Sequence, residues 1–276
     1  MLTTMKPRHS SMGHTPVGWL ARLYHENSKI TPASVSEIEA RIAAAGADEE
    51  HLRPCPATEP NLPHVPLPRP AGWTGLDRAI RRRRTTRALE ARPLRLRQLA
   101  RILFNASGVT HRPMGSRNAP VWPLRSAPSA GALYPIELRV GALNIRGLQG
   151  GVYRYHPYDH GLEMLASTVQ REELARASLH PDLVRTSAAV FALFADWDRV
   201  VTKYGDRGYR FALLEAGHMA QNILLTCADL RLASVPIGGF LDDECAGILA
   251  SDRLYLTYLV AVGRKALMAQ DAGCPD

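Results

Sequence analysis

Apolar side chains recur along this 276-residue chain with two different periods. Helical spacing, with apolar residues three or four positions apart, occurs at residues 17–24, 76–84, 96–108 and 209–230. Short apolar or β-rich runs, typical of strands, lie at residues 136–143, 151–155, 188–195 and 254–262. The alternation of the two patterns after residue 73 predicts an α+β or α/β domain. Its longest helix, residues 209–230, is long enough to cross a domain core.

The N-terminal part of the chain has a different character. Ser34 and Glu37 have the spacing of a capping box, and they predict a helix that ends at Gly46. Prolines recur throughout residues 51–72, which excludes a helix there and favours an extended strap. We therefore predict a helical region over residues 1–50, a Pro-rich linker over 51–72 and the main domain over 73–276.

Composition narrows the class of protein. A hydrophobic content of 46% supports a sizeable core, and no apolar run approaches the roughly 20 residues that span a bilayer. The N-terminus lacks the apolar segment of a secretory signal, so we expect a cytoplasmic protein with no membrane partner. The net charge of +8 would suit an anionic partner, but its only dense run is Arg81 to Arg84. The four cysteines form no CxxC pair, which favours reduced thiols over zinc or disulfides.

A run of small residues between two prolines is the first candidate for chemistry. It extends from Arg125 to Pro135 and reads R-S-A-P-S-A-G-A-L-Y-P, directly before the strand-like residues 136–143. Such a turn has little side-chain bulk, so its backbone N–H groups could approach a flat or phosphorylated ligand closely. The alternative is an ordinary loop between two elements.

Two further segments carry candidate functional groups. R-R-T-T-R at residues 83–87 offers three guanidiniums and hydroxyls at a helix end, which suits a phosphate, although a basic helix surface is the alternative. Lys203 and Tyr204 follow an apolar strand and precede the long helix, in a segment that we expect to be a loop. Such a pair could transfer protons if its environment lowered the pKa values from about 10.4 and 10, and it could equally be a surface lysine beside a packed tyrosine.

Other motifs are missing or incomplete. The chain contains no P-loop, no G-x-G-x-x-G and no G-x-S-x-G sequence. The usual evidence for a P-loop protein, a Rossmann fold or an α/β-hydrolase is therefore missing. Glu215 and His218 have the spacing of a di-iron carboxylate motif, but a second such pair is missing. We interpret both as polar residues of the core or of an interface, and we expect no metal.

Taken together and in order, the segments resemble SagB/ThcOx-type dehydrogenases of the FMN-dependent nitroreductase superfamily. The resemblance covers about residues 76–264 and adds G-V-Y-R-Y, K-Y-G-D-R-G-Y-R, E-A-G-H-M-A-Q-N, P-I-G-G-F and A-V-G-R to the segments above. It implies an α+β nitroreductase-like fold, in which helices flank a central mixed, mainly antiparallel sheet and a small helical extension precedes it. Thr85 departs from the family's commoner serine, and the loop 109–124 matches no family motif.

The resemblance also implies an FMN site. Its phosphate would be bound by Arg83, Arg84, Thr85, Arg87 and Arg264. The flavin would lie along Pro128, Ser129, Ala130 and Gly131 and against the backbone of Pro236, Ile237, Gly238 and Gly239, with Asn222 as a polar contact. Such enzymes are homodimers with FMN at the subunit interface, and the helix 209–230 would be a dimer element.

The activity that the resemblance implies is oxidation of thiazoline or oxazoline rings to thiazoles or oxazoles, with Lys203 and Tyr204 as catalytic residues and oxygen as the oxidant of the reduced flavin. The substrate would be a modified peptide or a carrier-bound intermediate, and the partner a cyclodehydratase or a synthetase. Three alternatives stay open: a flavin reductase that uses NAD(P)H, a non-catalytic scaffold subunit, and a basic nucleic-acid-binding module, for which no recognition motif is present.

Overall fold

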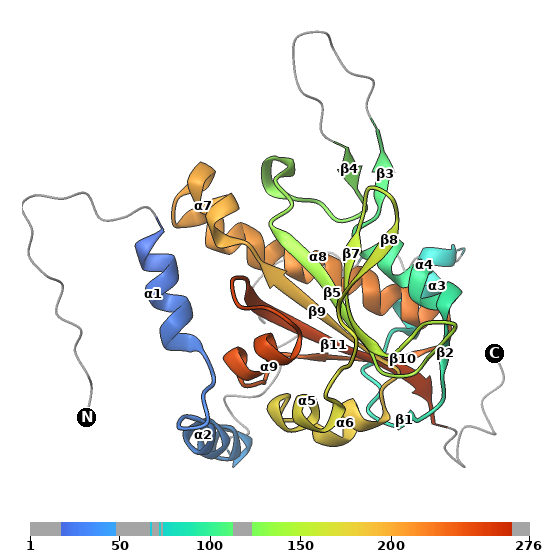
Figure 1. Cartoon of the computed structure of the whole chain (residues 1–276), viewed down its shortest axis with the longest axis horizontal. Coiled ribbons are helices and arrows are strands. Elements are labelled where there is room, and N and C mark those ends of the chain that lie inside the picture. Colours follow the sequence, from blue (N-terminus) through green and yellow to red (C-terminus); the bar gives the residue numbers. More distant parts are fainter. Residues whose placement is uncertain (1–17, 48–66, 68–71, 73, 113–122, 267–276) are drawn as a thin grey trace, which may run out of the picture.

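The computed structural model describes residues 18–47, 67, 72, 74–112 and 123–266. Its centre is a seven-stranded antiparallel sheet with the order β1-β11-β9-β5-β7-β8, in which β10 also pairs with β11 (Figure 1). The strands are β1 (Leu89–Glu90), β5 (Ile136–Ala142), β7 (Gly151–His156), β8 (Gly161–Ala166), β9 (Ala189–Ala195), β10 (Ala233–Ile237) and β11 (Tyr255–Lys265). Two small pairs lie outside this sheet: β2 (Leu94–Arg95) with β6 (Ile145–Arg146), which is parallel, and β3 (Val109–His111) with β4 (Leu124–Arg125).

Helices cover both faces of the sheet. One face packs against α4 (Leu96–Ser107), α7 (Trp197–Tyr204) and the long α8 (Arg207–Asp229). Helix α3 (Gly75–Arg82) packs against α8. The other face packs against α5 (Arg171–Ala177), α6 (Pro181–Thr186) and α9 (Asp242–Ile248). This arrangement confirms the predicted α+β class. All the pairings in the main sheet are antiparallel, so the expected mixed character is confined to the small β2–β6 pair.

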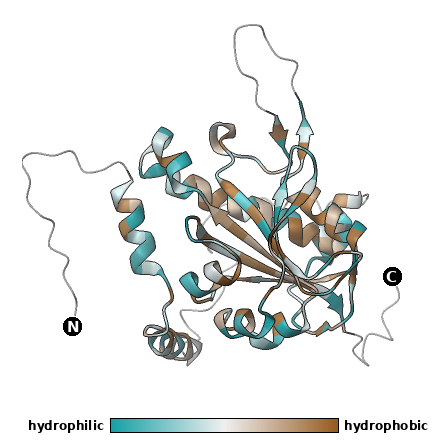
Figure 2. Ribbon diagram, viewed as in Figure 1, coloured by the Kyte–Doolittle hydropathy of each residue, from teal (hydrophilic) through white to brown (hydrophobic). Residues whose placement is uncertain are grey.

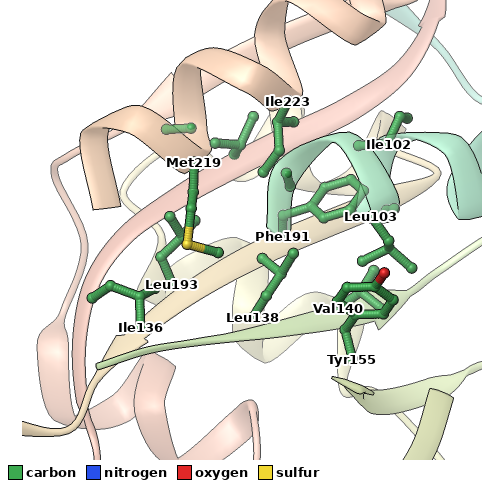
Figure 3. Packing of buried hydrophobic residues seen from close by; sticks show 14 of the residues in the cluster. Ile102, Leu103, Ile136, Leu138, Val140, Tyr155, Phe191, Leu193, Met219 and Ile223 are labelled. Carbon is green, nitrogen blue, oxygen red and sulfur yellow. The ribbon is translucent and has the colours of Figure 1, made fainter. Parts of the chain in front are cut away.

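The central strand β9 shows why the core has two halves. All seven of its residues are buried, and because side chains alternate across a strand, Phe191 and Leu193 point toward α8 while Val190 and Phe194 point toward α5 and α9. The first half is shown in Figure 3, which labels Ile102, Leu103, Ile136, Leu138, Val140, Tyr155, Phe191, Leu193, Met219 and Ile223. Figure 2 shows that the central strands are largely hydrophobic, whereas the surrounding helices carry hydrophilic as well as hydrophobic residues.

The N-terminal helices are α1 (Trp19–Ser28) and α2 (Val35–Ala47). His25 of α1 is buried against the rings of Trp197, Tyr209 and Tyr255, with centroid distances of 5.6, 6.2 and 4.9 Å. The Ala21 amide donates to the Asp206 carboxylate at 3.0 Å, which links α1 to the turn between α7 and α8. Helix α1 thus packs directly on the elements that carry Lys203 and Tyr204.

Several sequence predictions need correction. Gly46 does not end its helix, because α2 continues to Ala47. Lys203 and Tyr204 are not in a loop: residues 197–204 form α7, whose N-terminus is capped by Asp196. The sequence patterns also missed β8, β10, α5, α6 and α9, which are too short for the helical and strand periods to be distinctive.

Other predictions lie outside the described residues. Only residues 67 and 72 of the predicted Pro-rich linker are described, so the division into three regions stays a prediction. Cys55 and Cys274 also lie outside, whereas Cys227 and Cys245 are buried free thiols, and burial raises the pKa of each to about 12. In the described parts of the chain, no helix combines the length and the apolar character needed to cross a membrane.

Candidate active site

The small-residue run folds into a tight turn beside α7. Ala130–Ala132 form a single 3₁₀ turn, and Gly131, Ala132 and Tyr134 have positive φ angles of 59°, 53° and 49°. Three side-chain bonds hold this uncommon backbone. The Tyr134 amide donates to the Ser129 hydroxyl at 2.9 Å, the Arg125 amide donates to the Tyr134 hydroxyl at 2.9 Å, and Ser129 also bonds Glu215.

Gly131 lies directly against the predicted catalytic pair. A Cβ atom at this position would collide with the Tyr204 hydroxyl and would lie 2.7 Å from Lys203 Nζ. The absence of a side chain therefore allows the turn to pack against both functional groups. The structure brings together two segments that are more than 70 residues apart in the sequence, and the sequence patterns alone did not indicate this contact.

Lys203 and Tyr204 occupy the last turn of α7. The helix ends at Gly205, whose φ of 55° few other residues adopt readily and whose amide donates to Val201 at 2.8 Å. Lys203 Nζ lies 5.4 Å from the centroid of the Tyr204 ring, and that ring makes an edge contact with Phe211 at 5.0 Å. Tyr204 is half-buried and Lys203 is exposed, so the described residues do not bury the amine.

A buried carboxylate supports the turn from behind. Glu215 of α8 is only 2% exposed, and its Oε1 accepts from the Ile136 amide at 3.3 Å and bonds the Ser129 side chain. Desolvation raises the pKa of Glu215 to about 7, opposed by these bonds and by the charges of Arg125 and Arg199. Its Oε2 is buried without a partner among the described residues. The sequence interpretation placed Glu215 in the core but missed its contact with the turn.

The predicted phosphate-binding residues gather at another edge of the fold. Arg83 caps the end of α3, and the Thr86 amide donates to the Ser234 carbonyl of β10 at 3.3 Å. Arg264 lies on β11, where it pairs with Glu90 of β1. The residue before it, Gly263, pairs with Ala233 of β10. The R-R-T-T-R segment, β10 and Arg264 are therefore neighbours in the structure.

The R-R-T-T-R segment belongs to no helix or strand, and its residues divide between those that line a neighbouring cavity and those that do not. Arg84 and Thr86 line a cavity of about 280 Å³ together with Arg82, Arg231 and Lys265. The Arg84 guanidinium donates to the carbonyls of Arg81 and Arg83, both at 2.9 Å. Arg83, Thr85 and Arg87 do not line this cavity. The basic residues thus form two distinct surfaces, and the sequence patterns did not indicate the contributions of Arg82, Arg231 and Lys265.

The predicted flavin-facing residues form two groups, one at the end of β10 and one in the turn beside α7. Pro236 and Ile237 end β10 and are followed by Gly238 and Gly239. A Cβ atom on Gly238 would meet nothing within 4 Å, and one on Gly239 would meet only Leu179 at 4.0 Å. These glycines therefore leave space for a flat ligand. Pro128, Ser129 and Ala130 lie with Gly131 at the other end of α8.

The distance between the two groups of predicted site residues follows from the geometry of helix α8, which both groups contact. The cavity beside Arg84 is lined by Leu224 and Ala228, whereas Tyr204 packs on Phe211 near the start of α8. Ala228 and Phe211 are 17 residues apart, or about 25 Å at 1.5 Å per residue. Asn222 lies between them and lines a cavity with Leu76, Ala79 and Ser126. Within the described residues, the predicted phosphate-binding residues and the Lys203–Tyr204 pair thus lie at different ends of α8.

The outer face of α8 exposes apolar residues beside polar ones such as Arg210 and Gln221. Leu213 and Leu214 are 39% and 59% exposed, and a Cβ atom on Gly217 would meet nothing within 4 Å. His218 is also exposed, which separates it from the buried Glu215. Among the residues that the structure describes, no group of histidines, cysteines or carboxylates could hold a metal ion.

Comparisons with known proteins identify the family. The profile of the Nitroreductase family matches residues 80–264, and the chain belongs to this family of oxidoreductases. A candidate nitroreductase of Methanocaldococcus jannaschii, MJ1384, is 36% identical over 190 residues, which are 69% of this chain and 91% of that protein. The Microcin B17-processing protein McbC of Escherichia coli is 34% identical over 142 residues, which are 49% of this chain and 52% of McbC.

Solved structures show the same fold. A chain of the E. coli microcin synthetase McbBCD complex with truncated pro-MccB17 bound aligns over 90% of this chain and 92% of its own length, with a TM-score of 0.64 and 22% identity. A candidate nitroreductase from Anabaena variabilis aligns over 69% of this chain and 38% of its own length, with a TM-score of 0.58 and 28% identity. The predicted nitroreductase-like fold is confirmed.

Proposed function

We propose that the protein is an FMN-dependent oxidoreductase of the SagB/ThcOx type that dehydrogenates thiazoline or oxazoline rings in a peptide or carrier-bound substrate. The observation that carries this proposal is the contact of Gly131 with the Lys203 amine and the Tyr204 hydroxyl. It places two groups able to transfer protons against the turn that is expected to face the flavin. The similarity to McbC, a protein named for microcin B17 processing, supports the same reading.

The residues present fit an FMN molecule. Gly238 and Gly239 leave open space where a side chain would obstruct a flat ring, and Arg83, Thr85, Arg87 and Arg264 provide cationic and hydroxyl donors for a phosphate. When bound, FMN would accept the hydride removed from the substrate. Oxygen would then reoxidise it.

A homodimer would explain how one cofactor could reach two groups of residues that lie at different ends of α8. Because the phosphate-binding edge and the Lys203–Tyr204 pair contact α8 about 25 Å apart, one FMN could meet both only if a second copy supplied one of them. In a twofold pair that packs α8 against its counterpart, the exposed Leu213, Leu214 and Gly217 would be covered. The turn of one subunit would then face the phosphate-binding edge of its partner.

Lys203 and Tyr204 would carry out the proton transfer. Conversion of an azoline to an azole removes two electrons and two hydrogens, one as a proton and one as a hydride. Either Lys203 Nζ or Tyr204 Oη would take the proton from the carbon next to the ring nitrogen, and the other would orient the ring by a hydrogen bond. Packing against Phe211 fixes the tyrosine ring, and Gly205 fixes the end of the helix that carries both groups.

A second candidate function is reduction of a nitro, quinone or unsaturated peptide substrate at the expense of NAD(P)H. It is favoured by the similarity to MJ1384, a candidate nitroreductase that matches over 91% of its length. A scaffold subunit without activity is disfavoured, since Lys203 and Tyr204 are both present and lie together. A cyclodehydratase or synthetase partner fits the similarity to McbC.

The test uses the purified full chain and a synthetic peptide that carries one thiazoline. Azoline oxidation predicts a yellow protein that converts the peptide in air without a nicotinamide, with the loss of two hydrogen atoms detected by mass spectrometry. A folded but colourless preparation, or conversion of a nitroarene only with NAD(P)H, would contradict the proposal.

A further inference from the structure

A cavity of about 300 Å³ lies next to the turn, on the side of β5 and β7. Its walls include the rings of Tyr134, Tyr155 and Tyr158 and the side chains of Arg125 and Arg199. Two of these residues belong to elements already described: Tyr134 closes the small-residue turn, and Arg199 lies on α7 four residues before Lys203. The cavity therefore adjoins the candidate active site without containing Lys203 or Tyr204.

Most charges around this cavity neutralise one another. Glu137 pairs with Arg139 at 2.6 Å and with Arg154 at 3.1 Å, and Glu163 pairs with Arg154 and His156, both at 3.0 Å. The Asp196 carboxylate accepts from the Arg199 amide at 3.2 Å and caps α7. Glu137 and Glu163 are thus paired with cationic side chains, whereas Asp196 has a backbone amide as its partner.

The two remaining guanidiniums have no carboxylate partner within the described part of the chain. The Arg125 Cζ lies 4.4 Å from the Tyr134 centroid and 5.3 Å from the Tyr158 centroid, and the guanidinium donates to the Tyr158 hydroxyl at 3.5 Å. Its buried Nε has no hydrogen-bond partner among the described residues. Arg199 is exposed, and its side chain makes no hydrogen bond or ion pair with the residues that the structure describes. Both act electrostatically on Glu215, which lies behind the turn. A buried, unpaired guanidinium donor is costly unless an acceptor reaches it.

We propose that this cavity binds a carboxylate of the substrate chain, with Arg125 and Arg199 as its partners and the tyrosine rings as walls for the adjoining peptide. A guanidinium can bind a carboxylate through two parallel hydrogen bonds. Arg199 and Lys203 are separated by about 6 Å along α7, which an extended peptide covers in about two residues. The enzyme would therefore select substrates with an acidic side chain or a C-terminal carboxylate about two residues from the ring.

This inference rests on the proposed function only for the position of the ring. The probes are short peptides with a thiazole, which cannot turn over, and with either Asp or Asn two residues away. Calorimetry on the full chain should show that the Asp peptide binds about tenfold more tightly. The Arg199→Gln variant should reduce that ratio to near one and leave the affinity for the Asn peptide unchanged. Arg97→Gln, at another exposed arginine whose side chain bonds no described residue, should keep the tenfold ratio.

A wild-type ratio near one would overturn the inference. A tenfold ratio that survives in both Arg199→Gln and Arg125→Gln would also overturn it. Thermal melting checks that each variant folds. Because Arg199 is exposed, its variant alone keeps the test valid if Arg125→Gln fails to fold. Peptides with an amidated C-terminus distinguish an acidic side chain from a terminal carboxylate as the bound group. A second peptide pair with alanine in place of the thiazole separates this inference from the proposed function. Retention of the Asp preference there, together with no azoline oxidation, would sustain the carboxylate site and contradict only the proposed chemistry.

Discussion

Lys203 Nζ lies 5.4 Å from the centroid of the Tyr204 ring, and both residues enclose the position where Gly131 has no side chain. The pair is held from two directions. Asp206, at the turn after α7, accepts from the Ala21 amide of α1, and Tyr204 packs on Phe211 of α8. The turn that meets the pair is held in turn by Ser129, Tyr134 and Glu215.

The Gly131→Val variant should lose bound flavin and activity before it loses the fold. Its β-branched side chain would need a φ of 59° and would displace the Tyr204 hydroxyl, so we expect at least a tenfold loss of turnover and roughly 1–3 kcal/mol of stability. Flavin content and thermal melting measure the two effects. Gly247→Ala, at an open helical position, is the matched control and should keep the flavin without lowering the stability. A fully active Gly131→Val enzyme would show that the contact does not matter.

Glu215 should make stability depend on pH. Burial raises its pKa to about 7 from the ordinary 4.5, so the folded state holds a proton that the unfolded state has already released. The stabilisation that this shift contributes is fully present below pH 4.5, and it is lost as the pH rises from 4.5 to 7. The total loss in the free energy of unfolding is about 3 kcal/mol. Denaturant unfolding at pH 5 and pH 8 should show this loss in the wild type and not in Glu215→Gln. An identical pH dependence in both proteins would contradict the assignment, and Glu173→Gln, an exposed carboxylate, serves as the control.

The phosphate-binding surface can be assigned by two paired variants. Arg83→Ala with Arg87→Ala removes two arginines that do not line the neighbouring cavity, and Arg82→Ala with Arg231→Ala removes two that do. We expect the first pair to weaken FMN binding at least tenfold and the second to leave it within about threefold, since charge-assisted bonds contribute about 1.5–3 kcal/mol each. Flavin fluorescence during titration of the apoprotein measures the affinity. The opposite ranking would place the phosphate in the cavity.

The outer face of α8 predicts the oligomeric state. Leu214→Arg places a charge on an exposed apolar surface and should convert a dimer to a monomer that releases FMN. Ile42→Arg, at a residue 67% exposed on α2, should leave the dimer intact. Sedimentation velocity and flavin content are measured together. A monomeric wild-type protein that retains FMN would rule out the dimer.

The sequence predicted the long elements well, for identifiable reasons. The strand at residues 188–195 and the helix at 209–230 were found to within two residues, because β9 is continuously apolar and α8 has many apolar positions at helical spacing. The helix that carries Lys203 was missed because its eight residues are too short for a distinctive period. No local pattern could show that Gly131 meets Tyr204 or that Arg125 lies between two tyrosines, because these contacts depend on the tertiary fold.

The most direct test of the central claim is anaerobic mixing of the flavin-loaded enzyme with a thiazoline peptide in the absence of NAD(P)H. The flavin absorbance should fall in a single turnover as thiazole forms. Lys203→Met and Tyr204→Phe should slow this step by about 10²–10⁴ while they retain the flavin. The absorbance should recover when oxygen is admitted. If the flavin is bleached by NAD(P)H but never by the thiazoline peptide, the protein is a reductase and the account is wrong.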